Sequence, residues 1–162
     1  HISDVGFAPD RLQFELTETS VLKDPTAAAK RLRRPQKMGV RIALDDFGTK
    51  FSSLTYLRCF QPDTIKIDRF FVKDIVSSYA DAALVSAIVE MAKGLGINVI
   101  AEGVETVEHL ECLRDLGCHE DQGYLTTKPM PAAEMTEWLK MFAGDGYAEA
   151  DEQAEDEMRL SA

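Results

Sequence analysis

Short apolar segments alternate with amphipathic segments along most of the chain. The short segments predict strands at residues 11–16, 41–45, 64–68, 98–102 and 121–125. Between them, apolar residues recur at helical spacing, which predicts helices at 25–38, 81–95, 107–116 and 133–142 and a short helix at 54–58. Alternation of helices with nearly continuous apolar strands is typical of a parallel α/β sheet.

Polar caps and glycines mark the expected helix ends. Asp24 followed by Pro25 predicts the start of the first helix, and Asp81 and Thr106 are the expected caps of the helices at 81–95 and 107–116. Pro35 lies inside the first helix and should kink or shorten it.

Each predicted strand ends near a polar side chain that can bind a ligand or take part in catalysis. These residues are Glu15, Asp45, Asp46, Lys66, Glu102 and Gln122. The C-terminal ends of parallel strands carry ligands in (β/α)8 barrels and also in open doubly wound sheets, so both closures remain possible on this pattern. A barrel typically takes about 250 residues. It would require three further strands upstream of those predicted here.

The charge of the chain is uneven. The 162 residues are 45% hydrophobic, which is enough for one domain with a real core, and the net charge is −10. Such an acidic chain is a poor candidate for general nucleic-acid binding. Residues 145–162 hold seven acids against one arginine, so we expect a disordered acidic tail after a domain that spans residues 1–144.

Cysteine usage and hydropathy indicate a cytoplasmic domain. Cys59, Cys112 and Cys118 form no CxxC pair and lie among apolar neighbours, as expected of reduced core thiols. No apolar run is long enough for a membrane span, and no signal peptide opens the chain. The first residue is His1 rather than methionine, which suggests a fragment.

The adjacent acids Asp45 and Asp46 follow an apolar strand. Neighbouring carboxylates in such a place repel each other, and a hard divalent cation is the simplest compensation. The chain's three histidines are scattered, so oxygen ligands favour Mg²⁺ or Mn²⁺ over zinc. Two such ions bridged by an aspartate are the usual machinery for attack of water on a phosphodiester.

Each remaining motif also has a plainer interpretation. Glu15 and Glu18 fit a helix-capping box or a surface pair. Lys66 is either an edge-strand lysine or a cation directed into an acidic site. Glu105 can act on the dipole of the following helix, and Gln122 belongs to a common turn sequence.

Five motifs occur in one order across residues 5 to about 142, namely Glu15-Leu16-Thr17-Glu18, Asp45-Asp46-Phe47-Gly48-Thr49, Lys66-Ile67-Asp68, Glu102-Gly103-Val104-Glu105-Thr106 and Gln122-Gly123-Tyr124-Leu125. The set closely resembles the EAL family of cyclic di-GMP phosphodiesterases. The resemblance implies a TIM-like (β/α)8 barrel, here lacking its first strands. It also implies metal-dependent hydrolysis of cyclic di-GMP to linear pGpG with two Mg²⁺ or Mn²⁺ ions.

The resemblance assigns roles to individual residues. Glu15 and Asp46 resemble metal ligands, and Asp45 resembles the aspartate that bridges both ions. Glu102 is similar to a glutamate that binds the second ion or its water. Lys66 matches the lysine that positions or deprotonates the attacking water.

Further positions match supporting residues of the family. Glu18 resembles the residue that holds the loop after Asp46, and Glu105 and Asp68 match residues that support the site from behind. Gln122 matches a residue that contacts substrate or a metal-bound water. The loop at 47–53 lies near a dimer contact in the family, so the resemblance implies a homodimer.

The chain departs from the family in two places. The Glu-Ala-Leu motif and a later asparagine are absent, and both would lie upstream of His1. Lys50 stands where the family usually has glycine, which costs about 1 kcal/mol if the backbone there needs a positive φ.

Three functions therefore remain in view. The first is a cyclic di-GMP phosphodiesterase, possessing sensory or cyclase domains upstream and a possible membrane anchor there. The second is a non-catalytic cyclic di-GMP receptor. The third is an inactive fragment, because a barrel without three strands exposes two sheet edges.

Overall fold

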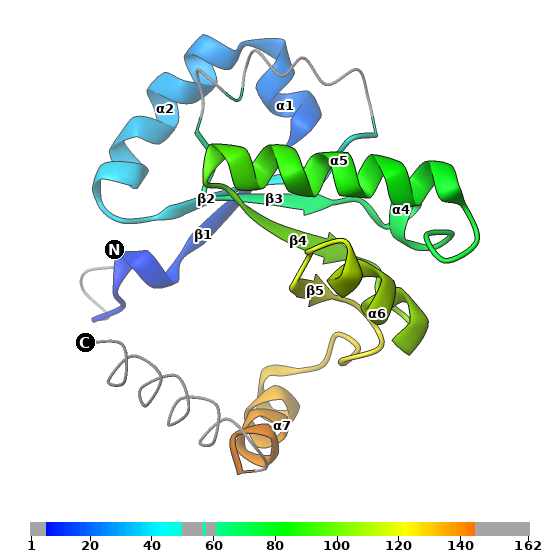
Figure 1. Cartoon of the computed structure of the whole chain (residues 1–162). Coiled ribbons are helices and arrows are strands. Elements are labelled where there is room, and N and C mark those ends of the chain that lie inside the picture. The colour runs from blue at the N-terminus through cyan, green and yellow to red at the C-terminus, as the bar shows by residue number, and fades with distance from the viewer. Residues whose placement is uncertain (1–5, 50–56, 58–60, 145–162) are drawn as a thin grey trace, which may run out of the picture. The chain divides into compact units, whose positions relative to one another are not determined.

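The computed structural model describes residues 6–49, 57 and 61–144 (Figure 1). The chain divides into two compact units, His1–Thr127 and Lys128–Ala162. Lys50, Cys59, the acidic tail and all of the predicted helix at 54–58 except Leu57 lie outside the described residues.

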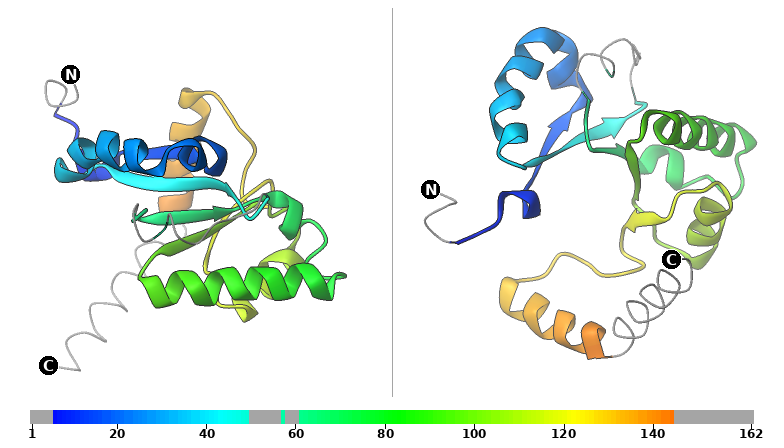
Figure 2. Two further views of the ribbon diagram at one scale, coloured as in Figure 1. Left: turned by 90° about the horizontal axis from the view of Figure 1, so that it is seen from above. Right: turned by 60° about the vertical axis from the view of Figure 1, so that its left-hand side comes forward.

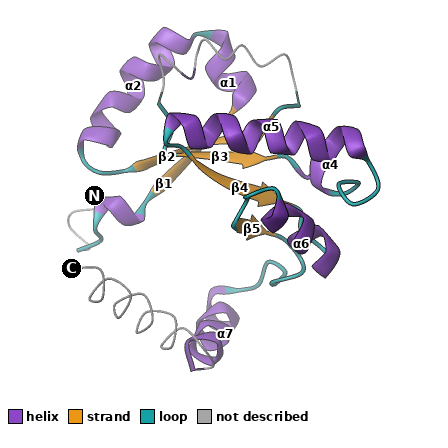
Figure 3. Cartoon of the chain, in the orientation of Figure 1, coloured by secondary structure: helices purple, strands orange, loops and turns teal. Residues whose placement is uncertain are grey.

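The first unit is built on a five-stranded sheet with the order β1-β2-β3-β4-β5. The strands are β1 (Gln13–Thr17), β2 (Arg41–Phe47), β3 (Thr64–Ile67), β4 (Asn98–Glu102) and β5 (Glu120–Gln122). Every neighbouring pair is parallel, so the predicted parallel α/β sheet is confirmed (Figure 3). Within the described residues the sheet does not close, and β1 and β5 form its two edges.

The α-helices of this unit cover one face of the sheet (Figure 2). They are α1 (Glu18–Lys23), α2 (Pro25–Lys37), α4 (Arg69–Val72), α5 (Tyr79–Leu95) and α6 (Val107–Asp115), and the 3-10 helix η2 (Pro9–Arg11) precedes β1. On β2, Ile42 and Leu44 pack into the core beneath α1, α2 and α5. Because strand side chains alternate, Ala43 and Asp45 face the opposite side.

The second unit contains α7 (Ala132–Gly144) among its described residues. Met135 and Trp138 are half-buried, while Lys140 forms an ion pair with Glu137 at 2.7 Å. Compared with the helix predicted at 133–142, α7 begins one residue earlier and ends two residues later.

One predicted helix cap was wrong, and one predicted shortening of a helix does not occur. Ser78, not Asp81, caps α5, because its Oγ accepts a hydrogen bond from the Asp81 N–H at 3.2 Å. Pro35 does not shorten α2, which continues to Lys37 and is followed by Met38 as its C-cap. Pro35 lacks the N–H that would donate to the Arg31 carbonyl, and because it stands in the last turn the helix ends soon after this lost bond.

Short elements were also missed or misplaced. Helices α1 and α4 have six and four residues, too few to give a periodic apolar pattern. The first strand begins at Gln13 rather than at residue 11, because η2 occupies Pro9–Arg11. The last strand is Glu120–Gln122 and ends three residues early.

The described cysteines behave as core thiols. Cys112 and Cys118 are free, and Cys118 is buried within the second hydrophobic cluster. Burial raises the pKa of Cys118 to about 11, so the thiol stays protonated at neutral pH. No helix among the described residues is long and apolar enough to cross a bilayer.

Gly123 allows the ends of β4 and β5 to approach closely. Val104 donates its N–H to Gln122 at 3.2 Å and accepts from Leu125 N at 3.0 Å, so its backbone lies directly against Gly123. A Cβ at Gly123 would overlap the Val104 backbone oxygen and nitrogen. Only glycine fits there without moving main chain.

Gly123→Ala is therefore expected to lower the free energy of unfolding by about 3 kcal/mol, the upper end of overpacking costs. Chemical denaturation of the intact protein measures the change. Gly94→Ala is the matched control, because Gly94 lies in α5 with open space around it. The control should be neutral or stabilising by up to about 1 kcal/mol. Equal unfolding midpoints for wild type and Gly123→Ala would contradict the close-approach argument.

Candidate metal and phosphodiesterase site

Lys66 stands at the centre of an acidic cluster at the C-terminal end of the sheet. It lies on β3, an inner strand between β2 and β4, and its side chain is 5% exposed. Its Nζ lies 2.5 Å from Glu102, 3.1 Å from Glu15 and 3.6 Å from Asp45. The interpretation of Lys66 as an edge-strand lysine is therefore wrong.

Strand register explains why these residues meet. Lys66 is paired with Ile100 on β4, so Lys66 and Glu102 lie close together at the strand ends. Asp45 projects from β2 on the same face, because Ile42 and Leu44 point into the core. The sequence places the acids at strand ends, and parallel pairing brings those ends together.

Three carboxylates form a candidate cation site. Asp45, Asp46 and Glu102 each offer an oxygen, and these atoms all lie within 4.8 Å of one another. Oxygen-only ligands at this spacing suit a hard divalent cation such as Mg²⁺ or Mn²⁺. The donor set therefore fits the metal that the sequence analysis expects.

Asp46 occupies an unusual backbone conformation. Its φ is 55°, the one positive value among the described residues other than glycine. Aspartate tolerates this left-handed region better than most residues, yet the conformation still costs about 1 kcal/mol. In this conformation the Asp46 N–H donates a hydrogen bond to Oδ1 of Asp45 at 3.1 Å.

Asp68 follows directly after β3 and lies beside Asp46. Burial, a hydrogen bond with the Asp68 side chain and the charges of Asp45 and Asp68 raise the pKa of Asp46 above its usual value. Asp68 is itself held in place, because it caps α4 by accepting from Phe70 N at 2.6 Å.

Burial and ion pairing oppose each other at the Lys66–Glu102 contact. Burial alone would lower the pKa of Lys66, but hydrogen bonds to Glu102 and Glu15 and the nearby negative charges raise it overall. Burial and the charges of Asp45 and Glu15 raise the pKa of Glu102 overall, although the contact with Lys66 lowers it. Lys66 is therefore a cation at neutral pH in this structure.

The other predicted site residues occupy different positions around the cluster. Glu15 pairs with Lys66, and its side chain is 47% exposed. Gln122 is exposed at the end of β5 and pairs in register with Glu102. Glu18 is buried at the start of α1. Glu105 is exposed, and the described residues provide no hydrogen bond or ion pair for its side chain.

The plainer interpretations receive little support. Thr17 is the N-cap of α1 without a side-chain hydrogen bond, so Glu15 and Glu18 do not form a capping box there. Thr106 caps α6 by accepting from His109 N at 3.2 Å. Glu108, rather than Glu105, supplies the acid in the first turn of that helix.

The close contact between Gly103 and Arg69, beside the acidic cluster, was not predicted from the sequence. Gly103 follows Glu102 with φ +72°, and a Cβ there would overlap the Cβ of Arg69. The segment after β4 thus packs against the start of α4 beside the acids. The only sequence signal for this contact is the glycine directly after Glu102.

Comparison with known proteins identifies the family. Residues 2–129 match the EAL domain family. The chain is 39% identical over 144 residues to the cyclic di-GMP phosphodiesterase NbdA of Pseudomonas aeruginosa, covering 89% of this chain and 18% of that protein. The chain spans about a fifth of the length of the curated relatives it matches.

Solved structures show the same fold. The chain resembles the PaMucR phosphodiesterase in complex with c-di-GMP, with a TM-score of 0.78 and 40% identity over 83% of this chain and 54% of that chain. It also resembles the Klebsiella pneumoniae BlrP1 manganese/cy-diGMP complex, with a TM-score of 0.75 and 39% identity over 79% of this chain and 33% of that chain. These EAL domains are TIM-like barrels, and the described sheet is part of such a barrel. The chain belongs to the EAL-domain family.

Proposed function

We propose that the protein containing this chain hydrolyses cyclic di-GMP to linear pGpG in a reaction that depends on divalent metal. The observation that carries the proposal is the convergence of Asp45, Asp46 and Glu102 within 4.8 Å, next to the buried Lys66. Relatives named as cyclic di-GMP phosphodiesterases support the choice of substrate.

Two Mg²⁺ or Mn²⁺ ions are the proposed cofactors, with Glu15, Asp45, Asp46 and Glu102 as their ligands. Bound there, such ions would lower the pKa of water and stabilise charge on the phosphate. The manganese/cy-diGMP complex of BlrP1 supports divalent metal use in this family. Glu15 forms an ion pair with Lys66 in this structure, so we propose that its carboxylate leaves Lys66 when it binds an ion.

The protein side chains then have separate tasks. Lys66 is a cation held by Glu102 and Glu15, so it donates hydrogen bonds and orients the attacking water. Asp68 and Glu18 hold the chain around Asp46, whereas the exposed Glu105 makes no such supporting contact among the described residues. Gln122, exposed at the end of the neighbouring strand, contacts the substrate.

The proposed context is a cytoplasmic homodimer with sensory or cyclase domains upstream. The much greater length of the relatives supports additional domains. The free, buried Cys118 is compatible with a reducing compartment. We assign residues 1–144 to the C-terminal portion of the EAL domain and residues 145–162 to an acidic tail.

The test is turnover of cyclic di-GMP by the intact protein. We expect pGpG to form with Mg²⁺ or Mn²⁺, to stop forming when a chelator removes the metal, and to form again when the metal is restored. Chromatography of the nucleotides measures product directly. Binding of cyclic di-GMP without metal-dependent pGpG would overturn hydrolysis and support the receptor function instead.

A further inference from the structure

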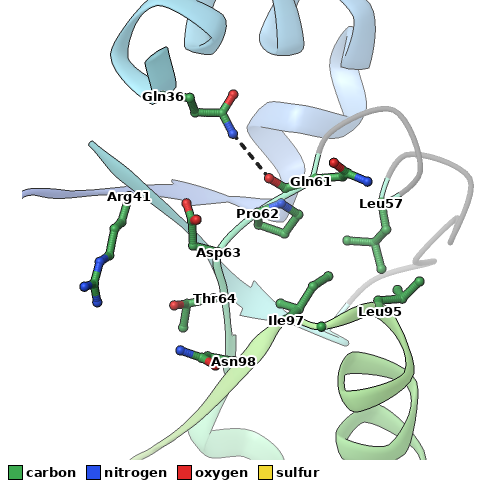
Figure 4. Close-up of a pocket in the computed structure, with 11 residues that line it drawn as sticks. Gln36, Arg41, Leu57, Gln61, Pro62, Asp63, Thr64, Leu95, Ile97 and Asn98 are labelled. Atoms are coloured by element: carbon green, nitrogen blue, oxygen red, sulfur yellow. Dashed lines mark hydrogen bonds between the residues drawn. The ribbon is translucent and has the colours of Figure 1, made fainter. Parts of the chain in front are cut away.

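Asp63 links the N-terminal ends of three strands, at the end of the sheet opposite to the acidic cluster. Its Oδ2 accepts from Ile42 N at 2.7 Å, and its own N–H donates to Ile42 O at 2.8 Å. Its carbonyl oxygen accepts from Asn98 N at 3.0 Å. Figure 4 shows Asp63 on the segment that leads into β3 and Asn98 at the start of β4.

The same three strands carry the candidate site at their other ends. On β2, Asp45 follows Ile42 by three residues, and on β3, Lys66 follows Asp63 by three. A shift of one residue between two strands turns every side chain to the opposite face. The position of Asp45 relative to Lys66 along the strand direction therefore depends on how β2 is aligned with β3.

Backbone pairing between β2 and β3 is irregular close to the site. The regular pairs are Ala43 with Thr64 and Leu44 with Ile65, after which the register shifts before Phe47 pairs with Ile67. Asp45 and Asp46 lie within that irregular stretch. The two regular pairs and the Asp63 contacts with Ile42 hence fix the alignment from the N-terminal side.

We propose that Asp63 is a positioning residue, whose side-chain hydrogen bond to Ile42 N sets the placement of Asp45 relative to Lys66 and Glu102. Ile42 is completely buried, so loss of the carboxylate oxygen would leave its N–H without this acceptor. The catalytic readout of this inference rests on the proposed function, but the metal and exchange readouts do not.

Three variants of the intact protein test the inference. Asp63→Ala removes the acceptor, whereas Asp63→Asn removes the charge but keeps an amide oxygen that can accept from Ile42 N. Gln36→Ala is the matched control, because Gln36 Nε2 donates to Gln61 O at 3.3 Å in the same region and not to Ile42 (Figure 4). Each variant is measured for hydrogen exchange at the Ile42 amide, Mn²⁺ affinity and kcat at saturating Mn²⁺.

We expect Asp63→Ala to expose the Ile42 amide to exchange and to lower Mn²⁺ affinity and kcat by about tenfold each. Asp63→Asn and Gln36→Ala should remain within about twofold of wild type, since neither removes the hydrogen bond to Ile42 N. If Asp63→Ala does not fold, Asp63→Glu replaces it, because its carboxylate is displaced by one methylene and should give the same losses.

Two results would overturn the inference. One is an Asp63→Ala protein of reduced thermal stability with wild-type Mn²⁺ affinity and kcat, which would make the residue merely structural. The other is an Asp63→Asn protein as impaired as Asp63→Ala, which would exclude the hydrogen bond as the cause. A wild-type protein that binds Mn²⁺ without hydrolysing cyclic di-GMP would overturn the proposed function alone, and Mn²⁺ affinity and exchange would still decide the role of Asp63.

Discussion

Asp45→Asn is expected to lower turnover of cyclic di-GMP by more than about 100-fold, together with the affinity for Mn²⁺. Replacing residues outside the ligand shell already costs 10- to 100-fold in metal sites, so a direct ligand should cost at least the upper end of that range. Asparagine has nearly the same size but no negative charge, and its NH₂ group cannot bind a cation. The loss should therefore be chemical rather than a consequence of unfolding.

The experiment combines an Mn²⁺ titration with steady-state kinetics on the intact protein. Asp115→Asn is the matched control, since Asp115 is an exposed residue at the end of α6 and lies outside the carboxylate group. It should behave as wild type in both measurements. Unchanged Mn²⁺ affinity in Asp45→Asn would remove Asp45 from the proposed ligands.

Lys66→Ala should lower kcat by about 10²- to 10⁴-fold, the usual contribution of a positioned proton-transfer group, and yet keep metal binding. Lys66 is the cation that contacts Glu102 and Glu15, and it is not among the proposed metal ligands. Its removal leaves the surrounding carboxylates without a counter-charge. We therefore expect Mn²⁺ to stabilise the variant against heat at least as strongly as it stabilises wild type.

Lys73→Ala controls for the loss of a lysine from the same segment of chain. Lys73 is exposed and pairs with Asp74 at 3.5 Å, an arrangement that contributes little to stability. Its kcat should match wild type. Lys66→Met provides a second test if the alanine variant is unstable, because it retains length without charge. Full turnover by a folded Lys66 variant would show that the lysine role is wrong.

The sequence predicted the chemistry better than it predicted the short elements. Adjacent acids after an apolar strand and a lysine on another strand pointed to one site, because parallel strands end at a common edge. It missed α1 and α4, whose lengths are too short for a periodic pattern. It also misassigned the cap of α5, since Ser78 and Asp81 are both good capping residues and only the backbone path decides between them.

Several features of the site have no local signal. The positive φ of Asp46, its contact with Asp68 and the position of Lys66 between three carboxylates all depend on pairing between strands far apart in the chain. The bond from Ile42 N to Asp63 is of the same kind, because it joins β2 to the segment that leads into β3. A single aspartate before a predicted strand does not indicate such a bond.

The sequence by itself determined the parallel α/β class, the approximate positions of the strands and the identity of the acidic residues. These follow from apolar periodicity and residue chemistry, which act over a few neighbouring positions. The tertiary structure alone decided which carboxylates share Lys66, which can hold an ion together and how the strand ends are aligned. Those properties depend on strand register and burial, which arise only when distant segments pack.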